Sequence, residues 1–185
     1  MGHSQADKAA THERILAIAA ERFREAGVDG LSVADLMKAA GLTHGGFYKH
    51  FRSRDDLVAQ AVTRALGESG ARMAAAGERT REALIDTYLN PAHRDDIGHG
   101  CAIAALSADM ARAGADARAP FTQAIAANIE AIAGLDSARR DAKARARAIT
   151  TLSALVGALS LARAVDDPAL SDEILAAVAT NLKSD

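Results

Sequence analysis

The stretch from Gly41 to Phe51, "GLTHGGFYKHF", decides how this chain folds. The residues around it have helical periodicity, yet the stretch contains two adjacent glycines, Gly45 and Gly46. Glycine inside a helix costs about 1 kcal/mol relative to alanine, so the pair needs a physical reason. A missing side chain can serve a turn, a helix cap or the close approach of another surface.

The composition of the whole chain is that of an ordinary soluble protein. It has 185 residues, of which 49% are hydrophobic and 25% charged, enough for one globular unit or two small ones. The single cysteine, Cys101, excludes an internal disulfide framework and favours a reducing compartment. The N-terminal residues lack the patterns of a secretory signal peptide and of a myristoylation signal. We therefore expect a cytoplasmic location.

Neither the charge nor the hydropathy of the chain indicates a nucleic-acid or membrane partner by itself. The net charge is −2, and residues 1–64 carry nine basic against eight acidic side chains. The most apolar run, residues 149–165, is at the lower length limit for a membrane span and contains Arg163. We interpret it as a buried helix, and any DNA contact must come from local placement of residues.

Two helices are predicted before the glycine pair. Ile15, Ala19 and Phe23 recur every four residues and predict a first helix that ends at Gly27. A second helix is predicted to begin at Ser32, where a hydroxyl residue precedes a short apolar-periodic segment.

Capping residues mark the boundaries of the second and third helices. Ser32 and Asp35 have the capping-box spacing, with aspartate in place of the usual glutamate or glutamine. Gly41 stands where the second helix needs a left-handed C-cap. Thr43 is a good N-cap for a third, short helix that runs to about His50.

The remainder of the chain is also predicted to be helical. A fourth helix is expected to begin within "RSRDDL", residues 52–57, and no stretch alternates convincingly like a strand. Beyond residue 66 the chain is rich in alanine, and glycine and proline mark the breaks. The helices predicted there lie near 78–89, 100–112, 116–133, 138–165 and 171–182. The predicted fold class is all-α, with about nine helices.

The second and third helices form a candidate helix-turn-helix unit. They are joined by the short turn 39–42, and the third helix would lie in the major groove of DNA. Gly45 and Gly46 at its front would then let the main chain approach the DNA closely. Phe47 and Phe51, four residues apart, should face inward and hold this helix against the first one. The alternative is a tight helical hairpin that packs on itself.

The polar residues of the third helix suit contacts with DNA. Thr43 and His44 at its start are placed to reach bases or adjacent phosphates. Tyr48 and Lys49, one turn later, are placed to bind the phosphate backbone.

These residues resemble a known family. Residues 30–62, "GLSVADLMKAAGLTHGGFYKHFRSRDDLVAQAV", preceded by "THERILAIAAERFREAG" at 11–27, closely resemble the DNA-binding domain of the tetracycline-repressor (TetR) family of bacterial transcription regulators. The most specific pieces are "AGLT", "FYKHF" and the basic Arg54. The resemblance covers roughly residues 8–65, and beyond it only the number and length of helices agree with the family.

The resemblance implies two domains and a set of DNA contacts. A three-helix DNA-binding domain would span residues 8–66, with its helix-turn-helix at about 32–51, and a helical effector-binding and dimerisation domain would span 67–185. Arg54 would hold a phosphate. Met37 stands where such units usually carry a small alanine, so the angle between the second and third helices can differ. The residues expected against the operator are Ser32, Thr43, His44, Gly45, Gly46, Tyr48, Lys49, His50 and Arg54.

The family also implies a homodimer on a palindromic double-stranded operator and a ligand that releases it, which is the behaviour of a repressor. Stripes on the last two helices are the candidate dimer interface, although they could instead pack within one chain. The interface residues would be Ile149, Leu152, Val156, Leu159, Ile174, Leu175, Val178 and Leu182. The effector would be small and mostly apolar. Its pocket would be lined by Tyr88, Cys101, Ile103, Leu106, Met110, Phe121, Ile125 and Ile129.

Other functions were weighed against this one. Cys101 follows "IGHG" near a predicted helix start, with His99 nearby, a setting that lowers a thiol pKa. It could sense electrophiles or oxidants, or it could be a small buried hydrophobe. His93, His99 and Cys101 are too few for a structural zinc site or a catalytic triad, so we expect no enzyme, metal or cofactor. A helical ligand-binding protein that does not act on DNA is a further alternative.

Overall fold

A computed structural model describes residues 5–75, 80–136 and 141–184 of the chain. Within these ranges the chain forms helices and connections, without strands, which confirms the all-α prediction. The elements are α1 (Gln5–Ala26), α2 (Val33–Ala39), the 3-10 helix η1 (His44–Lys49), α3 (Arg54–Ala75), α4 (Arg81–Tyr88), α5 (Pro91–Asp95), α6 (Ala102–Met110), α7 (Ala115–Asp136), α8 (Ala142–Ala164) and α9 (Pro168–Ser184).

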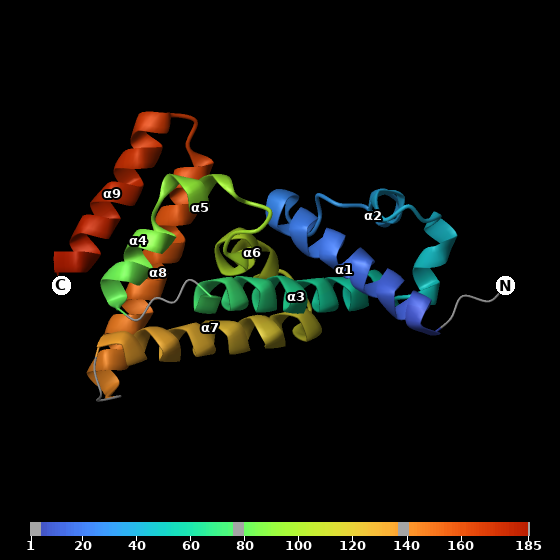
Figure 1. The fold of residues 1–185 in the computed structure, drawn as a ribbon, viewed down its shortest axis with the longest axis horizontal. Helices are drawn as coiled ribbons and strands as arrows, with labels where there is room; N and C mark the ends of the chain where they lie inside the picture. Colours follow the sequence, from blue (N-terminus) through green and yellow to red (C-terminus); the bar gives the residue numbers. More distant parts are fainter. Residues whose placement is uncertain (1–4, 76–79, 137–140, 185) are drawn as a thin grey trace.

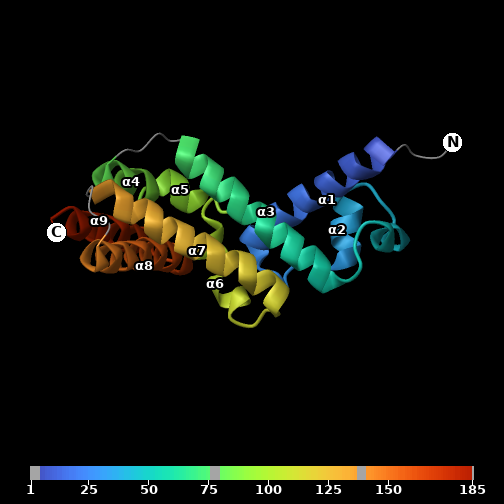
Figure 2. The same cartoon turned by 90° about the horizontal axis from the view of Figure 1, so that it is seen from below.

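The molecule is elongated, with its first and last helices at opposite ends. Figure 1 shows α1, α2 and the segment that follows them at one end, and α4, α8 and α9 at the other. The long helix α3 runs between the two ends and packs on α1 and α7. Figure 2, turned by 90°, shows the same order along the molecule. A single rigid helix therefore connects the helix-turn-helix region to the rest of the protein.

Local capping explains where α1 and α2 end. Gly27 has φ +75° and donates its N–H to the carbonyl oxygen of Phe23 over 2.9 Å, so it ends α1. Gly41 has φ +71°, as predicted for a left-handed C-cap. Leu42 N donates to Met37 O over 2.8 Å, which completes a Schellman motif.

The start of α2 also follows the sequence prediction. Ser32 is the N-cap residue, and its Oγ accepts the N–H of Asp35 over 3.1 Å. This hydrogen bond satisfies one of the donors that the first turn of a helix leaves unpaired.

Aromatic packing holds the helix-turn-helix region together. Phe23, Phe47 and Phe51 are almost fully buried in one cluster, as predicted. The rings of Phe47 and Phe51 stack with centroids 5.3 Å apart. Residues of α6 and α7, such as Leu106, complete the same cluster, so the helix-turn-helix region packs directly against the body of the protein.

The third predicted helix differs from expectation in its geometry. It is a 3-10 helix rather than an α-helix, with Gly46 N bonded to Thr43 O over 2.9 Å. Thr43 precedes it in an extended conformation, but its side chain makes no capping hydrogen bond. Two glycines among six residues disfavour a regular α-helix, which explains the tighter turn.

Other boundaries also shift. α3 continues to Ala75, so the predicted domain boundary after residue 66 falls inside this helix and remains a prediction. α9 begins at Pro168, because proline is compatible with the first turn of a helix. The short helix α5 was not predicted. Asn90 and Pro91 were interpreted as a break, but they are its N-cap and first residue.

The second core cluster joins α4, α7, α8 and α9. Leu155 and Leu159 from α8 meet Leu175 and Leu182 from α9 there, all buried. The apolar run 149–165 therefore lies mainly in α8 and packs against protein. Across the described ranges, no helix combines the length and apolar character needed to cross a bilayer.

Candidate DNA-binding surface and effector cavity

η1 presents a polar, exposed surface at one end of the molecule. Thr43, His44, Gly45, Tyr48 and Lys49 are all exposed there, and the Tyr48 ring is 72% exposed although it is aromatic. Buried Phe47 fixes η1 from behind, with its ring edge-on to that of Tyr48. A large aromatic side chain in water next to a lysine is the arrangement that suits contact with another polar molecule.

Neither glycine of η1 is required by the packing of the protein itself. Both have ordinary negative φ values, because the positive-φ glycines of the described chain are Gly27 and Gly41. A Cβ atom added to Gly45 would have no atom within 4 Å, apart from its chain neighbours and the backbone of its own helix. A Cβ on Gly46 would lie 3.5 Å from Met37 Cε, an ordinary contact. The long Met37 side chain thus fits beside Gly46, fully buried.

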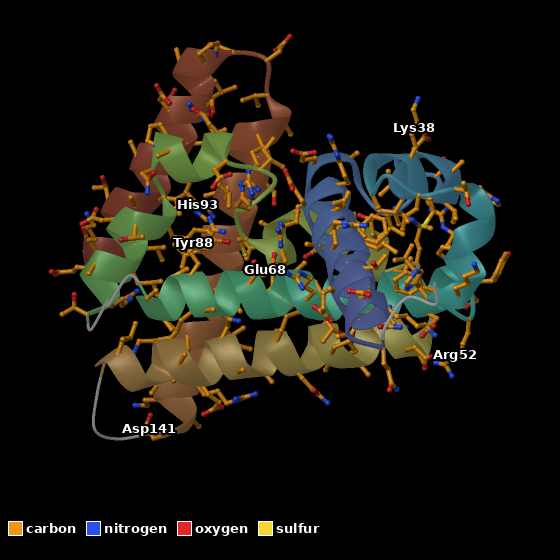
Figure 3. The ribbon with its side chains drawn as sticks, turned by 45° about the vertical axis from the view of Figure 1, so that its right-hand side comes forward. Lys38, Arg52, Glu68, Tyr88, His93 and Asp141 are labelled. Carbon is orange, nitrogen blue, oxygen red and sulfur yellow. The ribbon has the colours of Figure 1, made fainter. Side chains whose placement is uncertain are left out.

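Two exposed cations that sequence reasoning did not select lie near this surface. Lys38 projects into solvent from α2, as Figure 3 shows. The Arg52 side chain is 89% exposed just before α3, and its Nη2 lies 3.1 Å from Asp56 Oδ1. Hydrogen bonds from the Arg52 side chain and main chain lower the pKa of Asp56 to about 2. Lys38 lies within the helix-turn-helix and Arg52 follows it directly, and these positions are the signal that could have identified them.

His50 lies partly behind the surface. It is half-buried, and its Nδ1 has no hydrogen-bond partner among the described residues. Burial lowers the pKa of His50, and the nearby positive charges of His12, Lys8 and Lys49 lower it further. The His12 ring stacks on Phe51 at 4.7 Å. The pair of histidines therefore joins α1 to the end of η1.

Arg54 does not lie with the exposed residues of η1. Its Nη2 donates to Val28 O over 2.8 Å and lies 3.5 Å from Asp29 Oδ1. It lines a polar cleft of about 340 Å³ together with Asp109 and Arg112 from the α6–α7 region. Arg54 thus joins the start of α3 to the loop after α1, and a phosphate contact from it remains a prediction.

A second cavity, of about 320 Å³, lies between α3, α4, α5, α7 and the segment before α6. Of the eight predicted pocket residues, Tyr88, Cys101 and Ile103 line it. The others, Leu106, Met110, Phe121, Ile125 and Ile129, do not line it but belong to the core clusters or pack against them. Lining residues that the sequence did not indicate come from α3, a helix that was not predicted as a wall, and from α7, which was; they include Leu66, Ser69, Met73, Ala124 and Asn128.

His93 holds one wall of this cavity in place. Its Nδ1 lies 2.8 Å from the carbonyl oxygen of Tyr88, so it donates, and its Nε2 accepts the N–H of Cys101 over 3.2 Å. A histidine ring with one donating and one accepting nitrogen is neutral. Burial favours the same form, because it lowers the pKa of His93. Both nitrogens are occupied, which leaves neither for a metal or a catalytic proton. Among the described residues, no three or more His, Cys, Asp or Glu side chains gather as metal ligands.

Arg24 links the cavity to the helix-turn-helix region. It is a buried cation of α1 whose Nε donates to the carbonyl oxygen of Gly98, in the segment that precedes α6. Its Nη1 lies 3.3 Å from Ala65 O and its Nη2 3.0 Å from Glu68 Oε2, both on α3. Residues next to Gly98, including Asp96 and Cys101, line the cavity. A shift of this segment would therefore act on α1 directly.

The candidate dimer residues differ in how exposed they are. Leu159, Leu175 and Leu182 are buried within the chain itself, so they offer no exposed surface. Ile149 is 44% exposed, and Leu161 of α8, which the sequence analysis did not select, is 58% exposed. The remaining candidates are Leu152, which is 9% exposed, and the half-buried Val156, Ile174 and Val178.

Known proteins match the N-terminal region in sequence and the whole chain in fold. The family model described as "Bacterial regulatory proteins, tetR family" matches residues 15–61. The transcriptional regulator AcrR of Shigella flexneri is 38% identical over 50 residues, which are 27% of this chain and only 23% of AcrR.

Three of the similar solved structures cover nearly the whole chain. A TetR transcriptional regulator from Chloroflexus aurantiacus has a TM-score of 0.80 and 24% identity, over 97% of each chain. A TetR-family regulator from Cytophaga hutchinsonii has a TM-score of 0.79 and 20% identity, over 100% of this chain and 98% of the other. The reduced form of E. coli NemR has a TM-score of 0.76 and 20% identity, over 95% and 96%.

Proposed function

We infer that this chain is a DNA-binding transcriptional regulator of the TetR family that acts in the cytoplasm. The observation that carries this proposal is Gly45. It is exposed, it has an ordinary backbone conformation, and nothing in the described chain needs its side chain to be absent. A surface outside the chain that approaches the main chain closely supplies the missing reason.

The exposed cations around η1 suit duplex DNA. A short helix that enters the major groove brings its first residues to the base edges and its flanks to the phosphates. Thr43 and His44 are at the start of η1, and Lys49, Lys38 and Arg52 are exposed around it. Their charges would bind phosphates, while Tyr48 would donate a hydrogen bond to the backbone.

We propose that the protein binds a palindromic operator as a homodimer. One small helix-turn-helix makes few phosphate contacts, and a two-fold dimer doubles them. The exposed apolar residues Ile149 and Leu161 of α8 and Leu170 of α9 support an interface there. In sedimentation, Leu161→Glu should shift the protein toward monomer, whereas Ile97→Glu, on an exposed residue before α6, should not. Equal effects of the two changes would argue against this interface.

A ligand in the 320 Å³ cavity is the proposed release signal. A ligand changes operator affinity only by the difference between its affinities for the two arrangements of the protein. The Gly98 segment touches both the cavity region and Arg24 of α1, which offers a direct mechanical link. The expected behaviour is that of a repressor released by a small, mostly apolar effector.

A second candidate is a repressor that senses electrophiles or oxidants through Cys101. Its support is that Cys101 lines the cavity beside Tyr88, and that the reduced form of E. coli NemR is a structural neighbour. Iodoacetamide should then release DNA from the native protein but not from Cys101→Ser, which should still bind DNA. If both proteins respond alike, the thiol is not the sensor.

Binding of DNA tests the function itself. A pool of random duplex oligonucleotides is selected on the protein, and the affinity for the selected DNA is measured by fluorescence anisotropy at several salt concentrations. A regulator should prefer the selected DNA over a scrambled duplex and lose affinity steeply as salt rises. A helical ligand-binding protein that does not act on DNA would show neither property.

A further inference from the structure

Tyr88 carries an unusual group for a protein interior, a buried hydroxyl without an ordinary hydrogen bond. The residue is 3% exposed, and its Oη has no hydrogen-bond partner among the described residues. Buried polar groups are nearly always paired, because burial removes their water. The Cys101 thiol is the polar group that acts on the phenol, but sulfur is a weak acceptor, so this contact is a poor substitute for an ordinary hydrogen bond.

The unpaired hydroxyl belongs to a wall of the cavity and is held rigidly. Tyr88 is the last residue of α4 and lines the 320 Å³ cavity. The His93 ring meets the Tyr88 ring edge-on, with centroids 4.7 Å apart and an angle of 84° between the planes. His93 is itself fixed by its two hydrogen bonds. Figure 3 shows both side chains on the same side of α3. The hydroxyl is therefore positioned before any ligand arrives.

Ser69, Arg72 and Asp96, which also line the cavity, already have partners. Ser69 Oγ accepts the N–H of Ala102 over 3.1 Å and lies 3.0 Å from Gly100 O. At the cavity edge, Arg72 Nη1 lies 3.4 Å from Asp96 Oδ2.

Arg163 lies close to Tyr88 without lining the cavity. It donates to the main-chain oxygens of His93 and Arg94 over 2.8 and 2.9 Å. Its charge is therefore directed at carbonyl groups, and a charged ligand in the cavity would lose its water without gaining a free counter-charge.

The phenol acts as a donor at any physiological pH. Burial raises the pKa of Tyr88 well above its usual value, and the Cys101 thiol raises it further. A protonated phenol donates one hydrogen bond. The matching ligand atom is an oxygen that accepts it.

We propose that the cavity binds an uncharged compound with an apolar body and one carbonyl-type oxygen, and that this oxygen accepts a hydrogen bond from Tyr88 Oη. The volume lies at the small end of the range for ligand pockets, which favours a compact molecule. The ligand class rests on the proposed effector role of this cavity. It does not depend on DNA binding.

Calorimetric titration with three matched probes tests the proposal. Acetophenone and ethylbenzene differ by a carbonyl oxygen in place of two hydrogens, and benzoate adds a negative charge. The native protein should bind acetophenone at least tenfold tighter than ethylbenzene and should bind benzoate more weakly than acetophenone. Tyr88→Phe should bind the first two equally, with its affinity for ethylbenzene unchanged.

Control measurements distinguish a folding defect of the variant from a true loss of the hydrogen bond. They also distinguish failure of the regulatory role from failure of the proposed ligand class. Tyr88→Phe removes a hydroxyl that has no ordinary partner, so its melting temperature should equal or exceed that of the native protein. Tyr48→Phe, at the exposed tyrosine of η1, should keep the preference for acetophenone. If acetophenone binds as expected but does not release DNA, the regulatory role fails while the ligand class stands. Equal affinities in the native protein, tighter binding of benzoate, or binding of none of the probes would overturn the proposal.

Discussion

Replacing Gly45 with alanine separates the needs of the fold from the needs of DNA binding. The backbone at Gly45 has no positive φ, and the added methyl group would meet nothing within 4 Å beyond its chain neighbours and the backbone of its own helix. The folded protein therefore accepts the substitution without strain. The unfolded chain loses conformational freedom, so the native state should become more stable.

The Gly45→Ala substitution should change both the stability of the protein and its affinity for DNA. Glycine to alanine at a compatible position stabilises a protein by about 0.4–1 kcal/mol. For a chain of this length, that corresponds to a rise in melting temperature of roughly 1–4 °C. A methyl group between η1 and the floor of a DNA groove would hold the helix away from the bases. Loss of one good base contact costs about 1–3 kcal/mol, which weakens binding by roughly 5- to 150-fold.

Gly67→Ala is the matched control. Gly67 is an exposed glycine inside α3 with equally open space around it, but it lies away from η1. Thermal unfolding followed by circular dichroism should show that both variants are at least as stable as the native protein. Fluorescence anisotropy on the selected DNA should show weaker binding for Gly45→Ala alone. A Gly45→Ala protein that binds DNA as tightly as the native one would refute the reasoning about close approach.

Three further substitutions test the aromatic core, the contacts of Arg24 between α1 and the rest of the protein, and the pH dependence of stability. Phe51→Ala should destabilise the protein by about 3–5 kcal/mol in urea unfolding, because it opens a cavity in the aromatic cluster, and a loss below 1 kcal/mol would contradict that role. Arg24→Met should lower the free energy of unfolding by about 3 kcal/mol, which is the low end for a broken buried ion pair because Glu68 is one-third exposed. An unchanged unfolding midpoint would show that the contacts of Arg24 do not stabilise the fold. The pKa of His93 is lowered from 6.5 in the folded state, so the unfolded chain binds more protons than the folded protein. The stability that this group contributes is therefore present above pH 6.5 and is lost as the pH falls below that value. His93→Gln should make the decline of melting temperature below pH 6.5 shallower, and a slope identical to that of the native protein would exclude the assignment.

The features predicted most accurately from the sequence are those that depend on a few consecutive residues. Gly27 and Gly41 end their helices with positive φ, and Ser32 caps α2, because these effects need only a few consecutive residues. The inward direction of Phe47 and Phe51 also followed from local spacing. The 3-10 geometry of η1 did not follow from the residues, since two glycines weaken an α-helix without specifying the conformation that replaces it.

The cavity could be predicted only in part because its walls depend on how distant helices pack. Apolar spacing on α6 and α7 selected Leu106 and Phe121, but those faces are used against the first core cluster. Ser69 and Met73, far earlier in the chain, reach the cavity only because α3 extends to Ala75. Alanine-rich helices gave no signal for this arrangement, because alanine suits core and surface alike.

The central claim is that two copies of η1 enter duplex DNA as a symmetric pair, and a hydroxyl-radical footprint on the selected DNA tests it most directly. We predict two protected patches that are related by a two-fold axis and separated by about one helical turn or a multiple of it. A single patch, or even protection along the whole duplex, would contradict this claim.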